Sequence, residues 1–241
     1  MQEKPILKTA LSPRLLDLYP IKDSIVVVID VFRATSTMAT ALYNGAKKII
    51  PVDNVAKCIE IGTKTGGITA GERDGKVIEG LQYGNSPAEY PRDFIEGKVL
   101  VLTTTNGTKL LQMAVDKGAN EVITGSFPNI SAVCDYLIKQ KKNVILGCSG
   151  WKDVFNLEDT LFAGAVIERV KEHFTIHCDS SMMAEELYHK HAADIKDYIR
   201  KTTHWHRLSA FGLEKDLEYC VTNDVAPVLP YYKNSELVVK K

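Results

Sequence analysis

Polar and charged side chains follow the ends of several short apolar runs in this chain of 241 residues. The clearest case is Asp30, which comes directly after the apolar run 25–29 and stands three residues before Arg33. A carboxylate held at the end of a strand could ligate a hard cation or attack phosphorus. A guanidinium offers phosphate, sulfonate or carboxylate a planar fork of donors. Thr35 and Ser36 then open a helical run, where they could cap the helix or bind an anion.

Two other segments carry a similar mixture of groups. Thr104, Thr105 and Asn106 precede a helical run, and hydroxyls with free backbone N–H groups at a helix start can hold an anion. The segment is no Walker loop, because no Gly-Lys-Ser/Thr follows, and an ordinary turn with an N-cap is the alternative. Glu72 and Arg73 lie between two glycines, where the backbone can approach a ligand closely. Solvated surface charge is the alternative for this pair.

A third loop follows the apolar run 143–147. It contains Ser149 and leads to Glu158 and Asp159 in the first turn of a predicted helix, with Asn156 as the expected N-cap. The two acids could serve chemistry or only complement the helix dipole. Cys148 lacks the Cys-x5-Arg pattern of a phosphate loop, so we expect a buried structural thiol there.

The elements that must position these loops have the pattern of an α/β fold. Continuous apolarity over five or six residues indicates strands that are buried on both faces, as in a parallel sheet between helix layers. Ligands of such sheets bind at the carboxyl ends of the strands. The predicted strands span 25–30, 47–52, 99–103, 120–124 and 143–147, and the predicted helices span 35–44, 108–117, 130–141 and 157–174. We therefore predict a three-layer α/β/α fold with a mostly parallel sheet.

The order of these elements also suggests an internal duplication. Gly45-Ala46 and Gly118-Ala119 end two similar strand–helix units and are 118 − 45 = 73 residues apart. Two ordinary βαβ units are the alternative. A Gly-rich insertion over 61–92 separates them, a mostly helical part covers 180–218, and the tail from residue 225 is expected to be extended. We expect one catalytic unit over 1–241, which could consist of two interleaved lobes of about 1–140 and 141–241.

The composition of the chain argues against several classes of protein. Lys plus Arg and Asp plus Glu number 30 each, so the formal net charge is zero, which disfavours a general nucleic-acid binder. No apolar run approaches the roughly 20 residues that span a bilayer, and no signal-peptide core is present at the start. The five cysteines contain no Cys-x-x-Cys pair, and His204 and His206 lack a third zinc ligand nearby. We expect a reduced, cytoplasmic protein without a membrane or nucleic-acid partner, and we leave a homodimer open.

Taken together, five motifs resemble the 2-phosphosulfolactate phosphatase family. The resemblance extends from residue 25 to residue 230, and each motif alone is weak. The motifs are Val28-Ile29-Asp30-Val31-Phe32-Arg33-Ala34-Thr35-Ser36-Thr37, Gly71-Glu72-Arg73, Gly84-Asn85-Ser86-Pro87, Thr104-Thr105-Asn106-Gly107-Thr108 and Asn156-Leu157-Glu158-Asp159.

This resemblance implies a magnesium-dependent enzyme of coenzyme M biosynthesis that hydrolyses 2-phosphosulfolactate, a small anionic phosphorylated substrate, to sulfolactate and phosphate. It also implies an α/β fold unlike the common phosphatase folds. The expected catalytic residues are Asp30, Arg33 and Glu72; the substrate-binding residues are Arg73, Thr35, Ser36, Asn85, Thr104, Thr105, Asn106 and Ser149; and the Mg²⁺ ligands are drawn from Asp30, Glu72, Glu158 and Asp159. Whether Asp30 is the nucleophile or a metal ligand stays open.

Two other functions remain at this point. A haloacid-dehalogenase-like phosphatase also places an Asp after an apolar strand, but that family expects a second Asp two residues later, where this chain has Phe32. A non-catalytic anion-binding α/β protein would keep the same loops without turnover. Phosphate release from a phosphomonoester, with and without magnesium, separates these possibilities.

Overall fold

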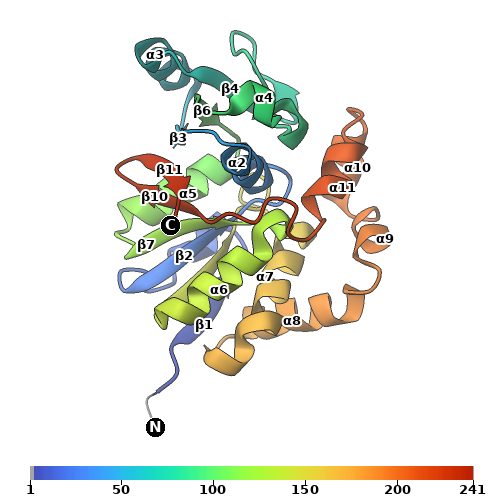
Figure 1. Cartoon of the computed structure of the whole chain (residues 1–241). Coiled ribbons are helices and arrows are strands. Elements are labelled where there is room, and N and C mark those ends of the chain that lie inside the picture. Colours follow the sequence, from blue (N-terminus) through green and yellow to red (C-terminus); the bar gives the residue numbers. More distant parts are fainter. Residues whose placement is uncertain (1–2, 241) are drawn as a thin grey trace.

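The computed structural model describes residues 3–240 and consists of one large sheet with helices on both faces (Figure 1). The strands are β1 (Ile6–Ala10), β2 (Ser24–Ile29), β3 (Lys48–Pro51), β4 (Ile68–Arg73), β5 (Lys76–Val77), β6 (Val99–Thr103), β7 (Glu121–Gly125), β8 (Asn143–Cys148), β9 (Thr175–Ile176), β10 (Pro230–Lys233) and β11 (Glu236–Val239). The α-helices are α1 (Pro13–Leu16), α2 (Ala34–Tyr43), α3 (Val55–Thr65), α4 (Arg92–Ile95), α5 (Gly107–Asp116), α6 (Ile130–Gln140), α7 (Leu157–Val170), α8 (Asp179–His191), α9 (Ile195–Ile199), α10 (Thr203–Ser209) and α11 (Glu214–Cys220). Short 3₁₀ turns cover Pro87–Glu89, Phe127–Asn129 and Lys171–His173.

The sheet contains two parallel blocks joined by an antiparallel hairpin. Its order is β5-β4-β6-β3-β11-β10-β7-β2-β8-β1-β9. Strands β4, β6 and β3 are parallel to one another, as are β7, β2, β8, β1 and β9. The hairpin of β10 and β11 pairs antiparallel with β7 on one side and with β3 on the other. The α/β class with a mostly parallel sheet is therefore confirmed.

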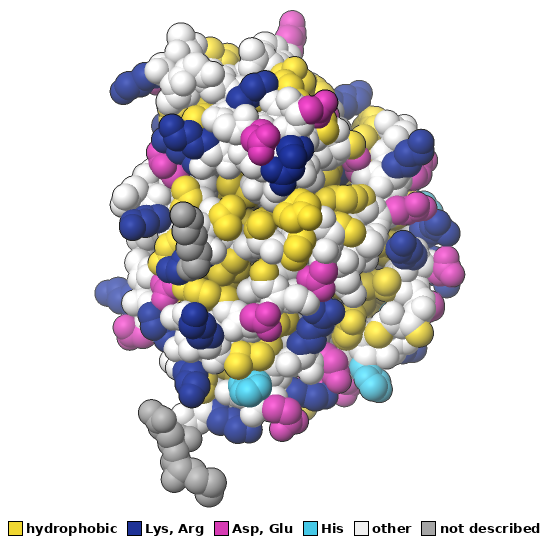
Figure 2. Space-filling model, in the orientation of Figure 1, with side chains coloured by type: hydrophobic (Ala, Val, Ile, Leu, Met, Phe, Trp, Pro, Cys, Tyr) yellow, Lys and Arg dark blue, Asp and Glu magenta, His cyan; other side chains and the backbone are white. Residues whose placement is uncertain are grey.

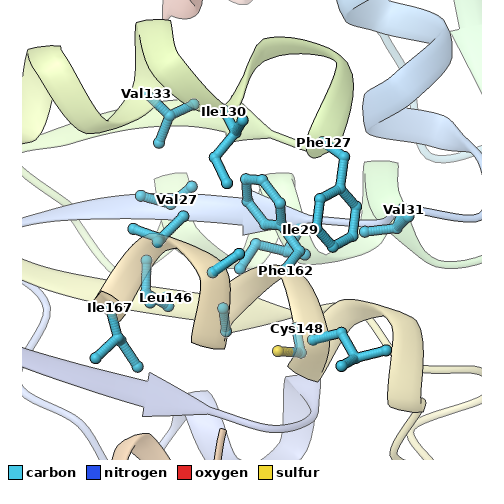
Figure 3. Close-up of a cluster of buried hydrophobic side chains, with 14 of the residues drawn as sticks. Val27, Ile29, Val31, Phe127, Ile130, Val133, Leu146, Cys148, Phe162 and Ile167 are labelled. Carbon is cyan, nitrogen blue, oxygen red and sulfur yellow. The ribbon is translucent and has the colours of Figure 1, made fainter. Parts of the chain in front are cut away.

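Strand β2 lies in the interior of the sheet and explains the continuous apolar run of the sequence. Ile25, Val27 and Ile29 enter one hydrophobic cluster with side chains of α6 and α7. Figure 3 shows Val27 and Ile29 in this cluster. Val26 and Val28 enter a second cluster on the opposite face, with side chains of α2 and α5. A strand that is buried on both faces has no reason to alternate with polar residues.

The two similar units of the sequence occupy corresponding places in the sheet. Strands β2 and β6 each lie inside a parallel block, while β3 and β7, which follow them, flank the hairpin. Gly45 and Gly118 both have the positive φ, 96° and 74°, that ends a helix before the next strand. This correspondence is compatible with a duplication and with two ordinary βαβ units alike, so a common origin of the two units stays a prediction.

Two segments contribute more to the sheet than their sequences indicated. The tail from residue 225 was expected to be extended, and it forms the hairpin that joins the two blocks. Strand β1 was not predicted at all, and it pairs with β8 and β9. The boundary expected near residue 140 lies between α6 and β8, inside the second block, whereas the strands of the first block all come from residues 48–103.

The surface agrees with the balanced charge of the chain. Basic and acidic side chains alternate over the face drawn in Figure 2 without a continuous basic tract. Within residues 3–240, none of the helices combines the length and the apolarity needed to cross a bilayer.

Candidate active site

The starts of helices α2 and α5 meet directly beside Asp30. A Cβ atom at Gly107, the first residue of α5, would lie 2.7 Å from Asp30 Oδ2 and 2.8 Å from the Cβ atom of Ala34, the first residue of α2. Only glycine allows this approach without displacing a neighbour. Because the N-terminal end of a helix carries partial positive charge, two such ends next to one carboxylate favour a bound anion there.

Asp30 is almost completely buried, with 6% of its surface exposed, and lines a cavity between these helices and α10. Among residues 3–240, its Oδ1 accepts a single long bond, of 3.4 Å, from the Ala34 N–H. Burial, and next the negative charge of Glu72, raise the pKa of Asp30 to about 6. An Asp held in this way is a candidate functional group, because the fold keeps it where its charge is disfavoured.

Glu72 reaches the same cavity from the end of β4. Its Oε1 accepts from the Thr105 N–H at 2.8 Å, and its Oε2 accepts from the Gly75 N–H at 2.9 Å. These two bonds fix the carboxylate between the β4–β5 turn and the loop after β6. Since a carboxylate has about four acceptor positions, Glu72 still has lone pairs for a cation.

Arg33 is held in place by a partner that the sequence did not reveal. Its Nη1 donates to Asp216 Oδ2 at 2.5 Å, and Asp216 Oδ1 accepts from the Ser86 hydroxyl at 2.8 Å. Arg33 is 4% exposed and lines the cavity, while Asp216 comes from α11. The pair therefore joins the loop after β2, the Gly-rich insertion and the C-terminal helices at one point.

We expect Asp216→Asn to lower the stability of the protein substantially. It leaves the buried Arg33 guanidinium without its counter-charge, and breaking a buried pair costs about 3–5 kcal/mol. At about 2–4 °C per kcal/mol for a domain of this size, the melting temperature should fall by roughly 6–20 °C. Thermal unfolding followed by circular dichroism measures this. Glu214→Gln, at an exposed position of the same helix, is the control and should leave the transition unchanged.

Two predicted residues, Asp159 and Ser149, hold the loops of the site in place instead of lining the cavity. Asp159 Oδ1 accepts from the Val31 N–H at 2.9 Å, and its Oδ2 accepts from the Gly150 N–H at 3.0 Å and the Ser149 hydroxyl at 3.2 Å. Burial and the charges of Glu158 and Asp30 raise the pKa of Asp159 well above its usual range. Asp159 thus connects the loops after β2 and β8.

The hydroxyls of three other predicted residues are also bonded within the protein. Thr35 Oγ1 lies 2.9 Å from both the Asp30 and the Gly125 carbonyl oxygens, and its one proton can be donated to either of them. Ser36 Oγ donates to the Val31 carbonyl, and Thr104 Oγ1 accepts from the Thr108 N–H. These groups shape the loops, as N-terminal hydroxyls of helices commonly do. Cys148 is fully buried, as expected for a structural thiol.

Glu158 and His204 form a buried pair behind the cavity. His204 Nδ1 contacts Glu158 Oε1 and lies 3.0 Å from Asn156 Nδ2, while the other oxygen of Glu158 is buried without a partner among residues 3–240. His204 also lines the cavity, where its ring packs edge-on against Phe32. In the sequence, His204 is of interest only as a possible zinc ligand, and no local pattern places it beside Asp30.

The cavity brings together part of the predicted set and adds residues from α10. The predicted residues that line it are Asp30, Arg33, Glu72, Asn85, Thr105 and Asn106, and the additional ones include Phe32, Asp74, Trp151, His204, Arg207 and Leu208. Buried and unpaired side-chain atoms within residues 3–240 include Asn85 Oδ1 and Thr105 Oγ1, both from this lining. Such atoms normally have partners, so they are candidate contacts for a ligand.

Arg73 lies outside this cavity. Its Nη1 donates to the Glu72 carbonyl at 2.7 Å and its Nη2 to the Thr103 hydroxyl at 3.1 Å. It lines a second, open depression together with Asp53 and Lys109. Although Glu72 and Arg73 are adjacent in sequence, alternation along β4 sends their side chains to opposite sides.

The residues present suit a hard cation. No three His, Cys, Asp or Glu side chains in residues 3–240 are arranged to hold a metal ion by themselves. Mg²⁺ commonly uses only one or two carboxylates, and water and substrate phosphate complete its shell. Asp30 and Glu72 supply two carboxylates that repel each other, and Asn85 adds an unpaired buried oxygen. This set fits Mg²⁺, whereas the oxygens of Asp159 are already occupied.

Comparison with known proteins assigns the chain to a family. The family model described as 2-phosphosulpholactate phosphatase matches residues 10–235. The chain belongs to this family. A protein of Thermotoga petrophila named probable 2-phosphosulfolactate phosphatase is 40% identical over 223 residues, 92% of this chain and 95% of the relative. Proteins with the same name from Caldanaerobacter subterraneus and Clostridium acetobutylicum are 38% and 33% identical, and they cover 89% and 90% of this chain and 90% and 93% of their own lengths.

The matched range includes every group of the cavity. It begins before Asp30 and ends after Asp216, so the 2-phosphosulfolactate phosphatase family covers both the predicted loops and the residues that only the structure revealed. The resemblance drawn from the five sequence motifs is thereby confirmed at the level of the family.

Proposed function

We propose that this protein is a magnesium-dependent phosphatase that hydrolyses 2-phosphosulfolactate to sulfolactate and inorganic phosphate. The observation that carries the proposal is the placement of Asp30 and Arg33 in one buried cavity, at the meeting point of two helix N-termini. The choice of substrate follows the names of the relatives, and the groups in the site suit phosphoryl transfer. A cytoplasmic location and a place in coenzyme M biosynthesis are parts of the same proposal.

The position of each residue in the cavity indicates its role in the reaction. Arg33, fixed by Asp216, and the N-terminus of α5 bind the phosphoryl oxygens and offset their charge. Asp30 either attacks the phosphorus as the nucleophile or acts through a bound metal ion as its ligand. Asp30 and Glu72 would hold Mg²⁺, with Asn85 as a further oxygen donor. Bound there, Mg²⁺ would neutralise charge on the transferring group as a Lewis acid.

A substrate panel tests the proposal. We expect phosphate release from 2-phosphosulfolactate with kcat/KM at least about tenfold above that for 2-phospholactate, which lacks the sulfonate, or 3-phosphoglycerate. One charged contact more or less gives a difference of this order. Release would be measured with a coupled phosphate assay in the presence of MgCl₂. Equal rates for all three would leave a general acid phosphatase, and no release from any of them would favour the non-catalytic alternative.

A further inference from the structure

Arg207 of α10 is the second arginine of the cavity, and it is held differently from Arg33. Its guanidinium carbon lies 3.9 Å from the centroid of the Trp151 ring, and both residues line the cavity. Stacking on an indole fixes the plane of a guanidinium without using its N–H donors. Trp151 follows β8 and Arg207 comes from a helix more than 50 residues later, so this contact joins the loop after β8 to α10.

One donor nitrogen of Arg207 has no acceptor in the described part of the chain. Its Nη2 is buried without a hydrogen-bond partner among residues 3–240. Burial lowers the pKa of Arg207, and the negative charges of Glu158 and Asp74 oppose this effect. Glu158 is in contact with His204, and Asp74 is paired with Lys152 at 2.9 Å. A buried, charged donor without a partner is unfavourable, and a bound anion would supply what is missing.

We propose that Arg207 binds the sulfonate of the substrate. This assignment rests on the proposed function, in which the phosphate lies between Asp30 and Arg33 and the sulfonate and carboxylate extend away from it. A sulfonate stays ionised at every working pH, so its recognition needs a fixed cation rather than a titrating partner. Arg33 is assigned to the phosphate in that proposal, and Arg73 faces the other depression. Arg207 is the remaining arginine of the cavity lining.

The test compares three substrates that lose one anionic group at a time. 2-Phosphosulfolactate carries phosphate, carboxylate and sulfonate; 2-phospholactate lacks the sulfonate; and p-nitrophenyl phosphate carries the phosphate alone. In Arg207→Gln we expect kcat/KM for 2-phosphosulfolactate to fall at least about 30-fold. The values for the other two substrates should change by less than about threefold. Arg207→Lys keeps the charge without the planar fork, so its kcat/KM for 2-phosphosulfolactate should lie between those of the wild type and of Arg207→Gln.

A matched control separates this role from a general effect of losing an arginine. Arg200 also lies over an indole, 5.9 Å from the Trp205 centroid, but it pairs with Glu218 and does not line the cavity. Arg200→Gln should leave all three kcat/KM values at those of the wild type. Inhibition gives a second readout: against p-nitrophenyl phosphate, the Ki of sulfolactate should rise in Arg207→Gln, while the Ki of inorganic phosphate should not.

The outcomes distinguish this inference from the proposed function. If the wild type shows no preference for 2-phosphosulfolactate, the proposed function fails whatever Arg207 does. If the wild type has the preference and Arg207→Gln keeps it, the sulfonate assignment is overturned. An equal loss on the first two substrates alone would assign Arg207 to the carboxylate, and an equal loss on all three would assign it to the phosphate or the fold; both overturn the proposal. Should Arg207→Gln not fold, Trp151→Leu, which frees the guanidinium, must show the same selective loss.

Discussion

Replacing Asp30 by Asn should lower turnover at least about a hundredfold, the scale expected for a group that acts directly on the reacting atoms. The amide keeps the size of the side chain and can still accept from the Ala34 N–H, so the helix start should remain intact. What is lost is the negative charge beside the phosphoryl position. Steady-state phosphate release from 2-phosphosulfolactate measures the effect. Asp135→Asn, at an exposed position on α6, is the control and should be fully active.

The same substitution should stabilise the metal-free protein. Because the folded-state pKa of Asp30 is raised from 3.8 to about 6, the unfolded state releases this proton more easily, and stability is lost as pH rises from about 4 to 6. At 1.36 kcal/mol per unit, the ionised side chain destabilises the fold by about 2–3 kcal/mol at neutral pH. Asn removes this effect, so in excess chelator at pH 7.5 the melting temperature should rise by several degrees.

These two measurements together identify the role of the carboxylate. A folded Asp30→Asn variant with a near-normal rate would show that the chemistry lies elsewhere. A large loss of activity together with a lower melting temperature would indicate damage to the fold instead. Rapid-quench detection of a phosphoenzyme in the wild type would then separate a nucleophilic Asp30 from a metal-ligating one.

The local part of the site could be predicted from the sequence because its signals are local. Asp30 and Arg33 follow an apolar run whose burial on both faces fixes it inside the sheet, and Asn106 opens a helix after a similar run. The rule that ligands bind at the carboxyl ends of parallel strands then brings these loops together. Glu72 was found through its glycine neighbours. Gly75 has the positive φ of the tight turn between β4 and β5, and Gly71, inside β4, lies where a Cβ atom would be 2.4 Å from the Thr103 carbonyl oxygen.

The rest depends on contacts between distant segments that no local pattern encodes. His204 and Arg207 reach the cavity because α10 packs over it, and Asp216 because α11 follows. Helix α10 spans only seven residues, too few for a periodic pattern to show which face is covered. The adjacent residues Glu72 and Arg73 were treated as one unit, and the side-chain alternation of a strand separates them. Neighbours in sequence can therefore be assigned to one site when they lie in a loop, but not when they lie in a strand, where consecutive side chains point to opposite faces.

Removing magnesium should abolish activity. Two carboxylates, Asp30 and Glu72, face one cavity in which the charge of one disfavours the charge of the other, and a divalent cation turns this repulsion into attraction. A Lewis acid at the phosphoryl group contributes several kcal/mol to transition-state stabilisation, so excess chelator should lower turnover by about a thousandfold. Adding MgCl₂ after removal of the chelator should restore it.

Glu72→Gln makes this prediction specific to the site. The amide oxygen can still accept one of the two backbone bonds, from Thr105 or Gly75, but the second carboxylate charge is gone. The Mg²⁺ concentration for half-maximal activity should therefore rise at least about tenfold, the scale of one lost ionic contact. Glu79→Gln, exposed in the same insertion, should leave that concentration unchanged. Full turnover in excess chelator, with metal analysis showing none bound, would refute a metal-dependent mechanism and leave Arg33 and the two helix N-termini as the groups that offset the phosphoryl charge.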